Sequence, residues 1–196
     1  MPTIPALVAV LLAFSDDRTL RDPHGHPQHA IVQLRDQAPD SSASRVTREP
    51  DPPGWRLYIQ DPYVRDTARR MAEQAAEWFS FPQCQELLSE FADERGRPLS
   101  VRLTELGVTS GEYLRLVIFE DGTDQSRCRQ SGILAFTARG SRVIYLCGRD
   151  FMRTAQREPR EVRAVIIHEM LHSLGLGENP PSSKEITRRV KERCWR

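Results

Sequence analysis

The sequence predicts an α+β fold, with a small and mainly antiparallel sheet packed on one helix and further helices before and after it. Three observations lead to this prediction. Apolar residues recur at helical spacing across residues 62–80, and a second helical pattern covers residues 159–174. Between these patterns lie short apolar runs separated by turn-forming residues, which is typical of strands. Because helices and strands form separate blocks, the pattern indicates α+β rather than alternating βα units.

The first elements begin where a Pro- and Ser-rich composition gives way to larger apolar side chains. Residues 55–59 are expected to form a strand. Asp61 is placed to cap the helix of residues 62–80, since Pro62 would then occupy the first helical position, where proline is favoured. Two further helical segments are expected before the sheet: residues 82–93, and short helices between residues 98 and 113.

The expected sheet is followed by the helix that carries the most informative motif. Three apolar runs are expected to form strands: residues 114–119, 133–137 and 142–147. A short loop with a glycine joins the last two runs and predicts a hairpin. The helix of residues 159–174 ends at Gly175, and a final helix begins near Ser182.

The N-terminal region bears on the compartment. Residues 4–14 are apolar and uncharged, which predicts a signal peptide in residues 1–15, although no Lys or Arg precedes them. The alternative is a buried N-terminal strand. Residues 16–54 are expected to be a linker or a disordered tail, and residues 55–196 the folded domain.

The overall charge excludes some classes of partner. There are 28 basic and 27 acidic residues, a formal net charge of +1, so the basic surface typical of nucleic-acid binding is not expected. No apolar run reaches the roughly 18 residues that a membrane-spanning helix needs. We therefore expect no nucleic-acid partner and no integral membrane segment in the mature chain.

The four cysteines are even in number, and none forms a C-x-x-C pair, which argues against a thiolate zinc site. Two disulfides in an exported protein are expected, with reduced core thiols as the alternative. Of the three pairings available, we favour Cys128–Cys147, which brackets the expected strands, and Cys84–Cys194, which ties the last helix to an earlier one.

The helix of residues 159–174 contains the pattern H-E-x-x-H at His168, Glu169 and His172. Histidines four residues apart lie on one face of a helix, so both imidazoles can bind the same zinc ion. Glu169 is placed to take a proton from a water on that ion. The helix is apolar on nearly all sides, which predicts burial, and buried histidine and glutamate side chains need partners. A metal satisfies all three side chains, whereas the alternative is two core histidines hydrogen-bonded to the backbone.

Two carboxylates compete for the role of third zinc ligand. Gly175 can reverse the chain after the helix, which would bring Glu178 back under the metal. Glu185 is the alternative third ligand, but it also fits a capping box with Ser182 at the start of the last helix. We favour Glu178.

The run from His168 to Glu178 resembles the metzincin motif H-E-x-x-H-x-x-G-x-x-H and its snapalysin-like variant, which has a carboxylate in the last place. Glu178 stands where that family has histidine or aspartate. The longer string to Ser183 is similar to bacterial exported proteins regarded as metallopeptidases. A ligand set with Glu185 would instead resemble the gluzincins.

These resemblances imply a zincin fold, in which the edge strand of a small sheet lines a cleft above the zinc helix. Either residues 133–137 or residues 142–147 would form that edge. They also imply a tyrosine, histidine or arginine that stabilises the oxyanion. The sequence offers three candidates for this role: Tyr113, Tyr145 and Arg149.

The function expected from these residues is that of a secreted or periplasmic, zinc-dependent hydrolase, specifically a monomeric metallopeptidase acting on a peptide or protein. The alternative is a non-catalytic binding module stabilised by zinc, whose fourth protein ligand would come from Glu185 or a cysteine. A further cluster at His24, His26 and His29 is expected to be solvated and without a function.

Overall fold

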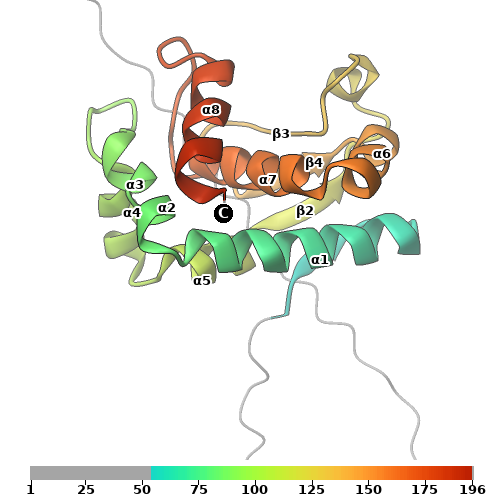
Figure 1. Ribbon diagram of the computed structural model, residues 1–196, viewed down its shortest axis with the longest axis horizontal. Coiled ribbons are helices and arrows are strands. Elements are labelled where there is room, and N and C mark those ends of the chain that lie inside the picture. The colour runs from blue at the N-terminus through green and yellow to red at the C-terminus, as the bar shows by residue number, and fades with distance from the viewer. Residues whose placement is uncertain (1–53, 196) are drawn as a thin grey trace, which may run out of the picture. The chain divides into compact units, whose positions relative to one another are not determined.

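A computed structural model of the chain describes residues 54–195. The expected signal peptide, nearly all of the expected linker and the cluster of His24, His26 and His29 lie outside these residues. The described part has an α+β fold with a small mixed sheet (Figure 1). Its elements follow in the order β1 (Arg56–Tyr58), α1 (Pro62–Phe79), α2 (Pro82–Gln85), α3 (Leu87–Glu90), α4 (Leu99–Leu106), α5 (Ser110–Leu116), β2 (Ile118–Asp121), the 3₁₀ helix η1 (Ser126–Arg129), β3 (Ala135–Thr137), β4 (Val143–Leu146), α6 (Gly148–Arg157), α7 (Pro159–Ser173) and α8 (Ser183–Cys194).

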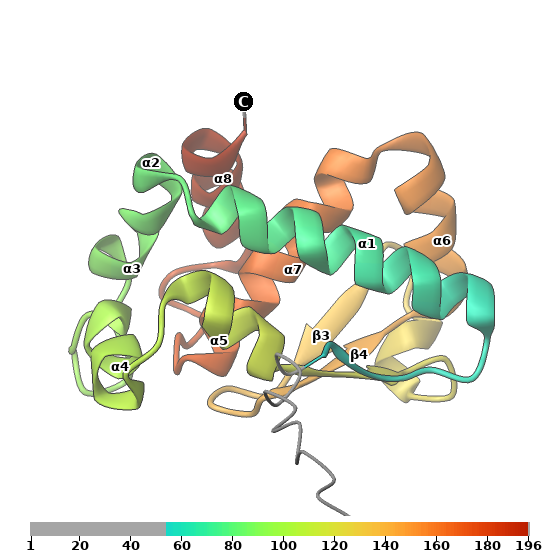
Figure 2. The same cartoon turned by 90° about the horizontal axis from the view of Figure 1, so that it is seen from below.

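Helix α1 starts as the sequence predicts. The Asp61 carboxylate accepts hydrogen bonds from the backbone amides of Tyr63 (2.8 Å) and Val64 (3.2 Å), with Pro62 in the first turn. This satisfies amides that have no partner within the helix. The apolar face of α1 then packs against α5 and α7, and Figure 2 shows α1 crossing α7. The N-terminal half of the domain is thereby fixed to the helix that carries the H-E-x-x-H pattern.

The sheet has the strand order β1-β2-β4-β3. The expected hairpin is confirmed, because β3 pairs antiparallel with β4. The expectation of a mainly antiparallel sheet is wrong, since β1 pairs parallel with β2 and β2 pairs parallel with β4. The segments between these strands in the sequence, helices α1–α5 in one case and η1 with β3 in the other, are long enough for the chain to return in the same direction.

Two segments before the sheet also differ from the expected helix and strand. Residues 82–93 form two short helices, α2 and α3, rather than one. The apolar run at residues 114–119 is only partly strand, because α5 occupies its first half. Helix α5 begins at a capping box in which Thr109 and Glu112 satisfy each other's backbone amides, and this local signal favours the helix.

Both expected disulfides are present, and none of the four cysteines is free. Cys84–Cys194 joins α2 to the end of α8, while Cys128–Cys147 joins η1 to the residue after β4. Such disulfides are typical of extracellular proteins. Among residues 54–195, no helix is both long and apolar enough to cross a membrane.

Helix α7 lies at the centre of the domain. It contacts α1, α6 and α8 as well as strands β3 and β4 (Figures 1 and 2). Along the strands, the side chains facing the helices are buried, as at Phe119 and Ile144, and alternate with partly exposed ones. In α7 itself, every residue from Ile166 to Ser173 is buried, so the expected burial of this helix on nearly all sides is confirmed for its C-terminal half. Strand β3 is the edge of the sheet next to α7.

Candidate metal centre

The turn after α7 is built as the glycine predicts. Gly175 has φ = +117°, a conformation that side chains rarely adopt, and its amide donates to the carbonyl of His172 (2.9 Å). The chain reverses there, and the next residue, Leu176, is buried and bonded back to the carbonyl of Leu171 (3.1 Å). This reversal carries Glu178 back beside the helix.

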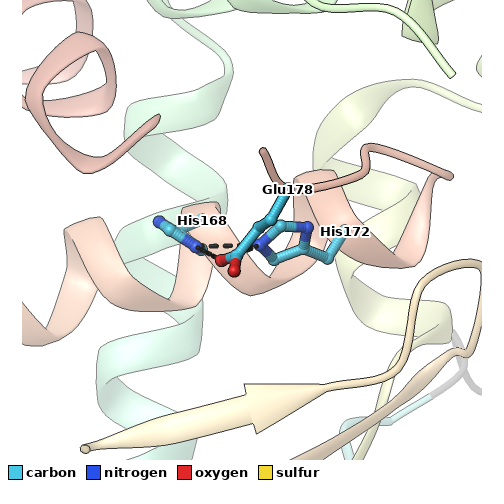
Figure 3. A group of neighbouring side chains, drawn as sticks. All are labelled: His168, His172 and Glu178. Carbon is cyan, nitrogen blue, oxygen red and sulfur yellow. Dashed lines mark hydrogen bonds and ion pairs between the residues drawn. The ribbon is translucent and has the colours of Figure 1, made fainter. Parts of the chain in front are cut away.

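His168, His172 and Glu178 converge on one point (Figure 3). The two Nε2 atoms are 2.9 Å apart, and Oε1 of Glu178 lies 3.2 Å from Nε2 of His172 and 3.7 Å from Nε2 of His168. Both histidines are buried, and the glutamate is about one-third exposed. Two segments that are local in sequence, one turn of α7 and the loop after it, thus supply all three groups.

Each histidine is oriented by a hydrogen bond at its other nitrogen. Nδ1 of His172 donates to the carbonyl of Leu176 (2.8 Å), so the Gly175 turn positions both this ring and Glu178. Nδ1 of His168 lies 2.9 Å from the hydroxyl of Thr187 on α8. Partners of this kind fix the ring orientation of metal-binding histidines.

The chemistry of the three groups fits a divalent cation. Burial, with a further contribution from the neighbouring His172, lowers the pKa of His168 to about 3, so this ring is neutral at neutral pH. Because a carbonyl can only accept, Nδ1 of His172 carries a proton, and its Nε2 in the neutral ring presents a lone pair. A cation placed between the two Nε2 atoms and the Glu178 oxygen would satisfy all three groups together. In a tetrahedral zinc site, neighbouring ligand atoms are about 3.3 Å apart, which is close to the three distances found here.

Glu169 lines the same cleft and lies next to strand β3. Its carboxylate accepts a hydrogen bond from the backbone amide of Thr137. Burial raises the pKa of Glu169 to about 8; the charge of Glu178 adds to the rise, while the Thr137 amide and Arg127 oppose it. The side chain is thus held next to the three ligand groups without being one of them.

Glu185 lies elsewhere. Its carboxylate pairs with Arg188 (2.7 Å) and Arg189 (2.8 Å) on α8, and hydrogen bonds from these two arginines lower the pKa of Glu185 to about 2. Half of the expected capping box is present, because the backbone amide of Glu185 donates to the Ser182 hydroxyl (3.3 Å). The group of ligand atoms found among the described residues contains Glu178 and not Glu185.

The cleft around the cluster has a volume of about 560 Å³. Of the two candidate edges, strand β3 borders it, through Ala135, Phe136 and Thr137. The other lining residues come from η1, the loops on either side of β3, α7, the segment between α7 and α8, and the first residue of α8: Arg127, Gln130, Ile133, Arg139, His168, Glu169, His172, Leu176, Gly177, Glu178 and Ser183.

None of the three side chains expected to stabilise an oxyanion lines this cleft. The Tyr113 hydroxyl donates to the carbonyl of Ser173 in the core, Tyr145 stacks on Phe136, and Arg149 pairs with Asp150. The cationic side chains at the cleft are instead Arg127 and Arg139.

Arg127, Arg139 and Thr187 are site residues that were not predicted from the sequence. Arg127 could have been predicted from the expected disulfide Cys128–Cys147. This bond ties the residue next to Arg127 to the end of strand β4. Thr187 carries no such signal, since its role depends on how α8 packs against α7.

No family model, no curated protein and no solved structure matches this chain. The functional interpretation therefore depends on the geometry and chemistry of the residues described above.

Proposed function

We propose that this protein is a zinc-dependent hydrolase of the zincin type, specifically a metallopeptidase. The observation that carries the proposal is the convergence of His168, His172 and Glu178 in a cleft that Glu169 also lines. Three protein ligands are typical of catalytic zinc sites, whereas structural sites are closed by four.

His168, His172 and Glu178 would hold the ion. When bound, zinc would lower the pKa of a coordinated water and polarise the carbonyl to be cleaved. Glu169 would accept a proton from the attacking water and pass it to the leaving amine. The Thr137 amide holds the Glu169 carboxylate at the β3 side of the cleft, where a substrate lying along the edge strand would pass.

The alternative of a non-catalytic zinc module has lost its candidate fourth ligands. All four cysteines are in disulfides, and the Glu185 carboxylate is occupied by two arginines. Among residues 54–195, the group of possible metal ligands contains only His168, His172 and Glu178, and three protein ligands support the hydrolase. Export to the periplasm or outside the cell, directed by a signal peptide in residues 1–15, completes the proposal and is supported by the two disulfides.

The test combines metal content with activity. His168→Ala and His172→Ala are expected to abolish stoichiometric zinc, measured by elemental analysis of the purified full chain. Glu169→Gln is expected to keep both zinc and fold but to lose hydrolysis of a mixed peptide library, monitored by mass spectrometry. Full zinc in both histidine variants would refute the metal site. Bound zinc without any Glu169-dependent cleavage would favour the binding module.

A further inference from the structure

The cleft contains two cationic side chains that the proposed reaction does not use, Arg127 in η1 and Arg139 in the turn after β3. The cleft carboxylates, Glu169 and Glu178, already have roles as proposed base and ligand. The charge of the arginines is therefore available for another purpose unless the protein itself neutralises it.

Arg139 is neutralised by the protein. Its guanidinium pairs with Glu94 (3.3 Å), with both side chains more than half exposed. It also lies against the loop after α7, where a Cβ added at Gly177 would come within 3.0 Å of its Nη1 atom. These contacts give Arg139 a structural role in joining the β3–β4 turn to the loop that carries Glu178.

Arg127 differs because no ion pair formed within residues 54–195 includes it. Its guanidinium lies over the ring of Phe136, with 5.6 Å from its central carbon to the ring centroid. The adjacent residue, Cys128, is anchored by its disulfide to Cys147. Contact with an aromatic face and a covalently fixed backbone limit the positions that the guanidinium can take, so less entropy is lost when it binds an anion.

Arg127 lines the same cleft as the proposed base, Glu169. Its exposed guanidinium presents a planar set of donors that matches a carboxylate, and its positive charge attracts anions to the cleft.

We propose that the cleft selects peptide substrates that carry a carboxylate close to the cleaved bond, and that Arg127 is the residue that binds this carboxylate. This proposal rests on the proposed hydrolase function, because only a hydrolase cleaves a bond in the peptide. Binding of the carboxylate itself does not require catalysis. The carboxylate can be an acidic side chain or the C-terminus of the peptide.

The test measures binding by calorimetry to the full chain carrying Glu169→Gln, with zinc supplied. The probes are an octapeptide blocked at both ends with one glutamate placed at each position in turn, the same peptides with glutamine, and the glutamine peptide with a free C-terminus. At least one carboxylate peptide is expected to bind about tenfold or more tightly than its neutral counterpart. Raised salt should reduce this preference.

Arg127→Gln is expected to abolish the preference, while Arg127→Lys should retain part of it. Arg129→Gln is the matched control, because Arg129 belongs to the same short helix and is exposed but lines a different pocket, beside the disulfide. A preference for the free C-terminus over the blocked peptide would identify the C-terminal carboxylate as the source, and a preference for one glutamate position would identify a side chain.

Equal binding of acidic and neutral peptides, no binding of either, or a preference that survives Arg127→Gln would overturn the assignment. These results can be separated from failure of the hydrolase. Zinc binding and Glu169-dependent cleavage without charge preference would leave the hydrolase intact, whereas an Arg127-dependent preference without zinc or cleavage would leave only the carboxylate site.

Discussion

At the scale of residues, the two candidate third ligands differ in what already surrounds them. Glu178 faces only the two imidazoles in the contacts found among residues 54–195, whereas Glu185 is held by Arg188 and Arg189. A carboxylate that faces two imidazole nitrogens gains most from a cation between them. The glutamate after the glycine turn is therefore the better candidate for the third ligand, and its role stays a prediction.

We expect Glu178→Ala to weaken zinc binding by more than about 100-fold. Loss of a direct ligand should reduce the affinity more than loss of a group that only hydrogen-bonds to a ligand. Glu185→Ala is the matched control on the other carboxylate and should leave zinc affinity unchanged. Competition titrations with a chromophoric chelator measure both. Loss of zinc in Glu185→Ala with retention in Glu178→Ala would instead indicate the gluzincin-like ligand set.

Thr187 is expected to act on zinc indirectly, by orienting His168 through the 2.9 Å contact at Nδ1. Thr187→Val keeps the shape of the side chain but removes its hydroxyl, and should lower zinc affinity by about 10- to 100-fold. Thr187→Ser restores a hydroxyl and should recover most of the affinity. If valine and serine variants bind zinc equally, the hydroxyl has no positioning role.

At the scale of elements, local sequence signals were sufficient to predict the features whose structure depends on residues adjacent in the sequence. The Asp61–Pro62 start of α1, the end of α7 at Gly175 and the β3–β4 hairpin follow from capping and turn chemistry. The parallel pairing of β1 with β2 was not predictable in this way, because it joins residues separated by helices α1–α5. Long-range pairing is fixed by the packing of the whole domain.

Helix α6 shows a different limit. It lies between β4 and α7 and went unpredicted, since most of its ten residues are polar or charged. Its buried apolar side chains, Phe151 and Ala155, lie four residues apart on one face, so the helical periodicity is present but depends on few apolar residues. The contact between Thr187 and His168 was also not predictable from the sequence, because it comes from the packing of α8 on α7.

The two disulfides connect elements over very different lengths of chain, and their removal should cost different amounts. Cys84 and Cys194 are 110 residues apart, against 19 for Cys128 and Cys147. Chain entropy alone predicts a loss of about 4.7 kcal/mol for the long loop and about 3 kcal/mol for the short one. Denaturant unfolding of the two paired Cys→Ser variants measures the difference, and a larger loss for the short loop would contradict the prediction.

At the scale of the whole molecule, the candidate metal site links segments that also pack against each other. Its candidate ligands come from the central helix α7 and from the loop that leads to α8, and the Thr187 contact extends the link to α8 itself. The two imidazole Nε2 atoms and a carboxylate oxygen of Glu178 lie 2.9 to 3.7 Å from one another there. Zinc should therefore stabilise the native state as well as provide for catalysis.

Binding of zinc to the folded state alone should raise the free energy of unfolding by about 2.7 kcal/mol when free zinc is 100 times its Kd. For a domain of this size the melting temperature should rise by about 5 to 11 °C. The measurement is thermal unfolding under non-reducing conditions, with zinc buffered in one sample and chelated in the other. His172→Ala is the control, because it removes a ligand while keeping both disulfides, and its melting temperature should be the same in the two samples. An equal zinc-induced rise in this variant would place the metal elsewhere in the chain, and no rise in the wild type would mean that His168, His172 and Glu178 do not hold zinc at this concentration.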